Sequence, residues 1–169
     1  ARAAVHWSPD VDTVFEIGGQ DSKYISLRGG QVADFQMNRI CAAGTGSFVE
    51  EQAARMGIPL AEFGPLALSA PSAVERGERC TVFIETAIQS ALSRGASQAE
   101  VAAGLCRSIV RNYLHKVVGA KPVGSRVVLQ GGVAYNPGIV AAFQQELGER
   151  LTVSPCFPIS GAYGAALLA

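Results

Sequence analysis

The strongest constraint on the fold is a run of three short β patterns separated only by glycine-containing turns. They span Thr13–Ile17, Ser22–Leu27 and Gln31–Met37. Short apolar or alternating segments bounded by glycines are typical of β-strands. Connections as short as residues 18–21 and 28–30 favour pairing of consecutive strands as hairpins. The N-terminal part of the chain is therefore predicted to be an antiparallel meander of three strands.

Downstream of the meander the apolar spacing becomes that of helices. The Ser97/Glu100 pair forms a capping-box pattern at one helix start, and Pro137 suits the first turn of another. Helices are predicted over residues 43–56, 81–94, 97–118 and 137–149, with a short helix inside 58–79, strands at 126–130 and 151–153, and a final helix from Ser160. Hairpins followed by alternating helices and strands predict a single α/β domain over residues 1–169.

Composition excludes several classes of protein. The 169 residues are 49% hydrophobic and 17% charged with a formal net charge of +0, which fits a domain with a substantial core and not a nucleic-acid-binding surface. No apolar run approaches the roughly 18 residues of a membrane span, and the N-terminus lacks the apolar centre of a signal peptide. Four cysteines in a chain of this length do not make a disulfide framework, so a cytoplasmic protein is expected.

Two glycine turns are candidates for ligand binding. Exposed backbone N–H groups in the first turn would bind phosphate oxygens, its carboxylate would hold Mg²⁺ through water, and a strand ending in paired glycines allows the second turn to approach a flat ligand. The candidate residues are Gly18, Gly19, Gln20 and Asp21 in the first turn, and Gly131, Gly132 and Val133 in the second. A plain hairpin turn is the alternative for the first. Gly44-Thr45-Gly46 has neither Rossmann nor P-loop spacing.

Two of the four cysteines, Cys41 and Cys80, each precede a predicted helix. Unpaired N–H groups and the helix dipole at such a position lower the pKa of a thiol and favour the thiolate. Two such thiolates are half of the four ligands that an iron–sulfur cluster usually has, and a two-fold dimer would supply the others. Cys106 lies on an apolar helix face and is expected to fill the core, and Cys156 is given no role.

The combined motifs resemble those of a known family. The segments are Asn38–Phe48, Cys80–Phe83 and Gly131–Ala134, set in a domain of the ribonuclease H-like fold shared by actin, sugar kinases and Hsp70. They are similar to the BadF/BadG/BcrA/BcrD ATPase family, and within it to the activators of 2-hydroxyacyl-CoA dehydratases, from about Val14 to Ala169. Glu16 stands where related ATPases commonly carry an aspartate.

The resemblance implies an ATP-driven donor of a low-potential electron to a CoA-ester dehydratase or reductase. It implies a homodimer with one 4Fe–4S cluster held by Cys41 and Cys80 of each chain. Gly18, Gly19, Gln20 and Asp21 would bind the phosphates with Mg²⁺, Gln20 and Asp21 being catalytic, and Gly131, Gly132 and Val133 would bind adenosine. The actin-like fold places ATP between two domains, and no Asp-x-Gly-x-Thr-like hairpin precedes Thr13. The chain is thus expected to be the C-terminal half of a two-domain ATPase, with the first phosphate-loop domain absent. By itself it is expected to be inactive.

Two other functions remain open at this point. One is a phosphotransferase domain related to sugar kinases. The other is a non-enzymatic dimerisation module in which zinc is bound by the same four thiolates.

Overall fold

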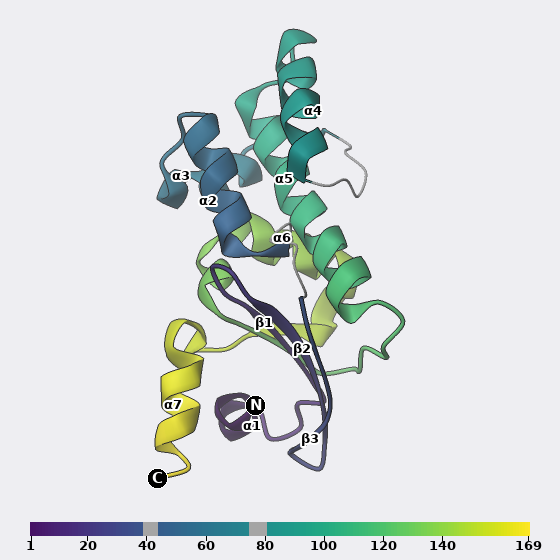
Figure 1. Ribbon diagram of the computed structural model, residues 1–169, viewed down its shortest axis with the longest axis vertical. Coiled ribbons are helices and arrows are strands. Elements are labelled where there is room, and N and C mark those ends of the chain that lie inside the picture. Colours follow the sequence, from purple (N-terminus) through teal and green to yellow (C-terminus); the bar gives the residue numbers. More distant parts are fainter. Residues whose placement is uncertain (39–43, 75–80) are drawn as a thin grey trace.

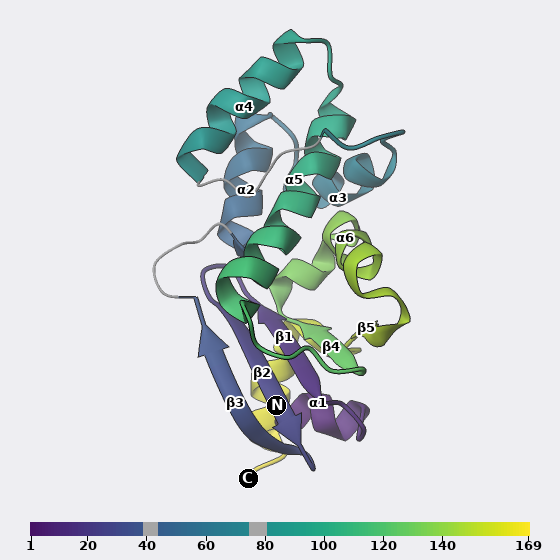
Figure 2. The same ribbon diagram turned by 90° about the vertical axis from the view of Figure 1, so that its right-hand side faces the viewer.

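The computed structural model describes residues 1–38, 44–74 and 81–169 as an α/β domain with one mixed sheet (Figures 1 and 2). The five strands lie in the order β3-β2-β1-β4-β5. They are β1 (Thr13–Ile17), β2 (Ser22–Arg28), β3 (Gln31–Met37), β4 (Val127–Gln130) and β5 (Leu151–Val153). β1, β2 and β3 pair antiparallel, as predicted, whereas β4 pairs parallel with both β1 and β5.

Seven α-helices within the described residues surround or extend the sheet. They are α1 (Arg2–Trp7), α2 (Gly46–Arg55), α3 (Leu60–Leu68), α4 (Thr81–Ser93), α5 (Gln98–Tyr113), α6 (Pro137–Leu147) and α7 (Ser160–Ala166). The π-helix η2 (Leu114–Val118) continues α5, which confirms the predicted extent of that helix to Val118. Figure 1 shows α2, α3 and α4 gathered beyond one end of the sheet, with α1 and α7 near its other end.

The two faces of β1 serve two apolar cores, because successive side chains of a strand point to opposite sides. Phe15 and Ile17 are fully buried against α5 and α6, and the Phe15 ring meets that of Tyr113 at a centroid distance of 5.0 Å. Val14 faces the other way, into a smaller core that includes Ala4 of α1. α1 and α7 pack together there, and a Cβ on Gly164 would lie 3.3 Å from the backbone nitrogen of Ala3.

Local signals fix the helix boundaries. The capping box predicted at α5 is present: the Glu100 N–H donates to Ser97 Oγ at 3.2 Å, and the Ser97 N–H donates to Glu100 Oε2 at 3.0 Å. Asn136 caps α6 by accepting from the Ile139 N–H at 3.1 Å, directly before Pro137. Gly57 ends the α2 segment with φ +66. α2 begins three residues later than predicted, at Gly46.

Removing the α5 cap should lower stability measurably. We expect Ser97→Ala to reduce the free energy of unfolding by about 1 kcal/mol, because the Glu100 N–H loses its acceptor. The carboxylate side of the box is pH-dependent. The Ser97 N–H, the Ser72 hydroxyl and the Ser97 hydroxyl donate to the Glu100 carboxylate and lower its pKa from the ordinary 4.5, so their contribution is present above that pH and is lost as the pH falls below it. Urea unfolding at pH 7 is the measurement. Ser93→Ala is the control, since the Ser93 hydroxyl donates to the Gln89 carbonyl of its own helix. An equal loss in both variants would contradict a capping role.

Candidate functional site

The two glycine turns lie side by side because they follow neighbouring parallel strands, β1 and β4. Gly131 contacts the end of β1 so closely that a Cβ there would lie 2.7 Å from the carbonyl carbon of Ile17. Its φ of +98 is a conformation that favours glycine. The two segments nominated from the sequence are thereby brought to one edge of the sheet, although Gly18 and Gly131 are 113 positions apart in the sequence.

Every backbone carbonyl of the first turn accepts a hydrogen bond. The Gly18 carbonyl accepts from the Gly46 N–H at 2.9 Å and the Gly19 carbonyl from the Ser47 N–H at 2.6 Å. The Gln20 carbonyl accepts from Asn38 Nδ2 at 3.1 Å, and the Asp21 carbonyl accepts from the Gly18 N–H at 2.8 Å. Hydrogen bonds from the start of α2 and from Asn38, the residue after β3, thus hold the turn in place.

The amides of the same turn are available to a ligand. Within the described residues, the N–H groups of Gly19, Gln20 and Asp21 have no acceptor, and these three residues are exposed. In a trans peptide the C=O and the next N–H point in opposite directions. Carbonyls fixed toward the protein therefore turn the following amides toward solvent, which is the arrangement of an anion-binding backbone nest.

The acidic groups near the turn differ in their surroundings. The Asp21 carboxylate is at the exposed tip and has no ion pair in the part of the chain that the structure describes. Glu16 is paired with Lys23 of the adjacent strand at 3.3 Å. Across from Glu16, the Gln130 Oε1 is buried and has no hydrogen-bond partner within residues 1–38, 44–74 and 81–169. Among the described residues, Asp21 is thus the unpaired carboxylate beside the exposed amides of the turn.

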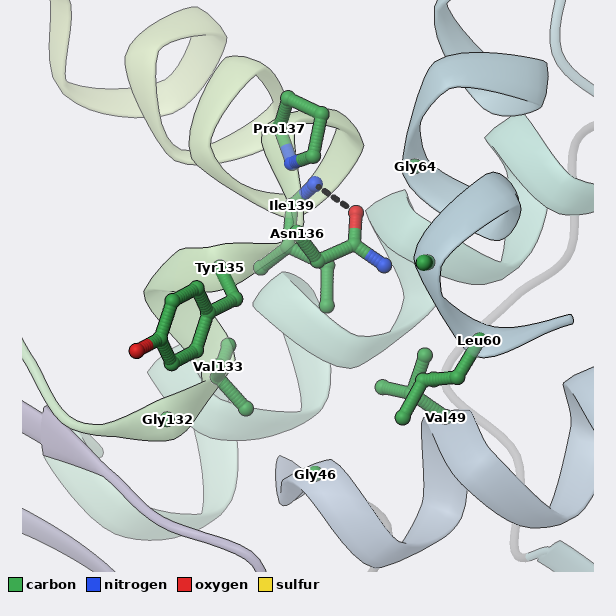
Figure 3. Close-up of a pocket in the computed structure, with 11 residues that line it drawn as sticks. Gly46, Val49, Leu60, Gly64, Gly132, Val133, Tyr135, Asn136, Pro137 and Ile139 are labelled. Atoms are coloured by element: carbon green, nitrogen blue, oxygen red, sulfur yellow. Dashed lines mark hydrogen bonds between the residues drawn. The ribbon is translucent and has the colours of Figure 1, made fainter. Parts of the chain in front are cut away.

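A largely apolar pocket of about 500 Å³ opens beside the second turn (Figure 3). Ligand pockets of this size and character accommodate small organic molecules. Its lining comes from the turn and from the helices around it: Gly132, Val133 and Tyr135 at the turn, Gly46 and Val49 of α2, Leu60, Ala61 and Gly64 of α3, and Asn136, Pro137 and Ile139 at α6. α3 and α6 meet tightly, since a Cβ on Gly64 would lie 2.5 Å from Pro137 Cδ.

Tyr135 stands at the pocket with 70% of its surface exposed, and its ring packs edge-on against Phe157 at a centroid distance of 4.7 Å. An exposed but braced aromatic ring is suited to covering one side of a planar ligand. α3 is the short helix predicted within residues 58–79, but neither its place at the pocket nor that of Tyr135 was predicted from the sequence. α2 also lines the pocket, and the sequence signal for this was Gly46, a small residue at the start of a helix.

The cysteines divide into two groups. Cys41 and Cys80, the predicted cluster ligands, lie outside the described residues. Cys106 is 1% exposed, as predicted for a core residue, and burial raises the pKa of its thiol to about 12. Cys156 is half-buried beside the Ser154 hydroxyl at 3.4 Å. Among the described side chains, no three His, Cys, Asp or Glu residues come together as metal ligands.

One further property concerns the described helices alone. None within residues 1–38, 44–74 and 81–169 combines the length and apolar character needed to cross a bilayer.

The fold defines the class of protein. A meander joined in parallel to further strands, with glycine turns at one edge, is the ribonuclease H-like domain of the actin/sugar-kinase/Hsp70 ATPases, as predicted. The ethanolamine utilization protein EutJ from Carboxydothermus hydrogenoformans shares it, with a TM-score of 0.57 at 17% identity over 99% of this chain and 53% of that chain.

The sequence profile of the BadF/BadG/BcrA/BcrD ATPase family matches residues 1–169, and the chain belongs to this family. The prediction made from the cysteine and glycine motifs is therefore confirmed at this level. This chain is 39% identical over 164 residues to the (R)-2-hydroxyglutaryl-CoA dehydratase activating ATPase of Acidaminococcus fermentans. The match covers 95% of this chain and 62% of that protein. The chain is 37% identical over 166 residues to the activator of lactoyl-CoA dehydratase of Anaerotignum propionicum, covering 95% of this chain and 62% of that protein.

A solved structure gives the same result. The activator of 2-hydroxyisocaproyl-CoA dehydratase from Clostridium difficile, with bound ADPNP, superimposes with a TM-score of 0.92 at 35% identity, over 99% of this chain and 63% of that chain. The chain spans about three fifths of the length of these relatives.

Proposed function

We propose that this chain is the nucleotide- and cluster-binding part of an ATP-driven activator that passes a low-potential electron to a CoA-ester dehydratase or reductase. The observation that carries the nucleotide half is the first glycine turn. The carbonyls of residues 18–21 all accept hydrogen bonds, and the amides of Gly19, Gln20 and Asp21 have no acceptor among the residues that the structure describes. Relatives named for activating 2-hydroxyacyl-CoA dehydratases support the choice of partner.

The proposed roles follow the geometry. The free amides bind phosphate oxygens, Asp21 holds Mg²⁺ through water, and the Gln20 side chain orients the attacking water. Gly131, Gly132 and Val133 face the adenosine, whose base enters the apolar pocket beside Tyr135. The ADPNP named in the structure of the Clostridium difficile activator agrees with an adenine nucleotide as the ligand.

The electron-transfer half rests on the family. Cys41 and Cys80 of each chain in a homodimer would hold one 4Fe–4S cluster, which supplies the low-potential electron when bound. Cys80 comes directly before α4 in the sequence, and the positive end of a helix dipole favours an anionic ligand such as a thiolate. Such a cluster requires a reducing compartment, and we place the protein in the cytoplasm.

Nucleotide binding is tested by calorimetry with ATP and Mg²⁺. We expect the 169-residue chain to fold but to bind ATP orders of magnitude more weakly than a two-domain relative, with negligible turnover. The N-terminal domain of the actin-like fold would supply further charge-assisted hydrogen bonds, each worth roughly 1.5–3 kcal/mol, and would help to hold the reacting groups in line.

Fusing the N-terminal domain of a relative to this chain should restore both binding and hydrolysis. Micromolar affinity and steady turnover by the chain alone would contradict the half-site. A fusion that folds but binds no nucleotide would contradict the proposed function as a whole.

A further inference from the structure

Ser47 makes an unusual pair of hydrogen bonds at the start of α2. Its N–H and its side-chain hydroxyl both donate to the same acceptor, the Gly19 carbonyl of the first glycine turn. A serine in the first turn of a helix commonly bonds to its own helix. Here the hydroxyl is directed to a segment 28 residues away in sequence. The hydrogen bonds therefore join two elements and do not cap α2.

The bonded carbonyl sets the direction of one peptide plane. The Gly19 carbonyl and the Gln20 N–H belong to the same trans peptide, so they point in opposite directions. Holding the carbonyl against α2 leaves the Gln20 N–H directed away from the helix, on the exposed tip of the turn. The Gly46 N–H donates to the Gly18 carbonyl and orients the neighbouring peptide in the same way. Gly46 has no side chain that could add a second hydrogen bond.

The contact is also close. A Cβ on Gly46 would lie 3.2 Å from the Gly18 carbonyl oxygen and 3.3 Å from the Gly19 Cα. The turn thus rests on the N-terminus of a ten-residue helix. An anion bound to the turn would polarise each peptide along its C=O, and the helix N–H groups would stabilise that polarisation.

We propose that Ser47 is a positioning residue for the phosphates, and that phosphate binding at the turn strengthens the hydrogen bonds at the start of α2. This inference rests on the proposed nucleotide function and assigns a role within it. The two effects are linked thermodynamically: whatever orders the turn favours the phosphate, and the phosphate favours the ordered turn by the same factor. Adenosine has no phosphate. Its affinity should therefore not depend on Ser47, and its binding should not strengthen the hydrogen bonds at the start of α2.

The test uses the ¹⁵N-labelled 169-residue chain, titrated separately with ADP and adenosine and followed by NMR, which measures weak binding. Ser47→Ala should weaken ADP binding about threefold to tenfold, the effect of one hydrogen bond, and leave adenosine affinity unchanged. Ser47→Thr, which keeps the hydroxyl, should restore ADP affinity. Ser69→Ala is the matched control. The Ser69 hydroxyl donates to the Leu66 carbonyl, at a distance of 2.8 Å, and this bond is not part of the first glycine turn.

Hydrogen exchange in the unaltered chain gives a second readout. ADP should slow exchange of the Gly46 and Ser47 amides, and adenosine should not. Unchanged ADP affinity in Ser47→Ala, an equal loss of adenosine affinity, or exchange that ADP does not slow would each overturn the role of Ser47. If neither the unaltered chain nor its fusion to the N-terminal domain of a relative bound ADP or adenosine, nucleotide binding itself would be refuted.

Discussion

Replacing Gly131 with alanine is expected to unfold the domain or to cost about 3–5 kcal/mol of its stability. The φ of +98 is strained for alanine, and the new Cβ would overlap the backbone of Ile17, within 2.9 Å of its nitrogen. Ile17 ends β1 and Gly131 directly follows β4, and these two strands are paired. Neither backbone segment can move apart without breaking hydrogen bonds of the sheet. Urea unfolding followed by circular dichroism measures the change.

The adjacent glycine is the control. Apart from its two chain neighbours, no described residue has a heavy atom within 4 Å of a Cβ built on Gly132, and the φ of Gly132 is not positive. Gly132→Ala should therefore retain nearly full stability. Because Gly132 lines the pocket, that variant should alter ligand binding without altering the fold. Similar losses of stability in both variants would mean that the close approach of Gly131 to β1 does not matter.

Substitution of either proposed cluster ligand should abolish iron binding completely. Cys41→Ser or Cys80→Ser removes two of the four ligands of the shared cluster, one from each chain of the dimer. Iron and labile sulfide per chain, with visible absorption, are measured on protein purified without oxygen. Light scattering should show the same variants shifted toward monomer, since ligands from two chains couple metal binding to assembly.

Cys106→Ser is the matched variant within the core. Its thiol is 1% exposed and lies against Gly138, so the change should lower stability by about 1–3 kcal/mol yet leave the iron in place. Iron lost equally from all three variants would contradict the ligand assignment. Colourless unaltered protein with stoichiometric zinc would replace the electron-transfer proposal with the zinc-bridged module.

Much of the fold was predictable because its signals are local. Glycine turns of three or four residues leave adjacent strands little choice but to form hairpins, which is why β1, β2 and β3 were assigned in the correct order and direction. Ser97 and Glu100 fix the start of α5 through bonds within four residues of chain. The motifs that identified the family are likewise short and contiguous.

The pocket and the support of the first turn were not predictable in the same way. They depend on side-by-side placement of segments distant in sequence. Ser47 looks like an ordinary helix residue until α2 is seen against Gly19. α3 carries Pro65 in its interior, which argues against a helix locally, yet Phe63 and Ala67 pack it into the core. Tertiary packing overrides the local preference there.

The parallel pairing of β1 with β4 has a consequence for how the protein is made. Thr13 of β1 pairs with Val127, so most of the chain must leave the ribosome before β1 acquires its second neighbour. Until then β1, buried on both faces in the finished domain, is an edge strand with open backbone groups, which is a risk of aggregation. Closing so long a loop is slow, and the second glycine turn arrives with it. A nucleotide bound to both turns, as proposed above, would therefore stabilise only the completed domain. Its presence in the cell would favour the last step of folding over the intermediates before it.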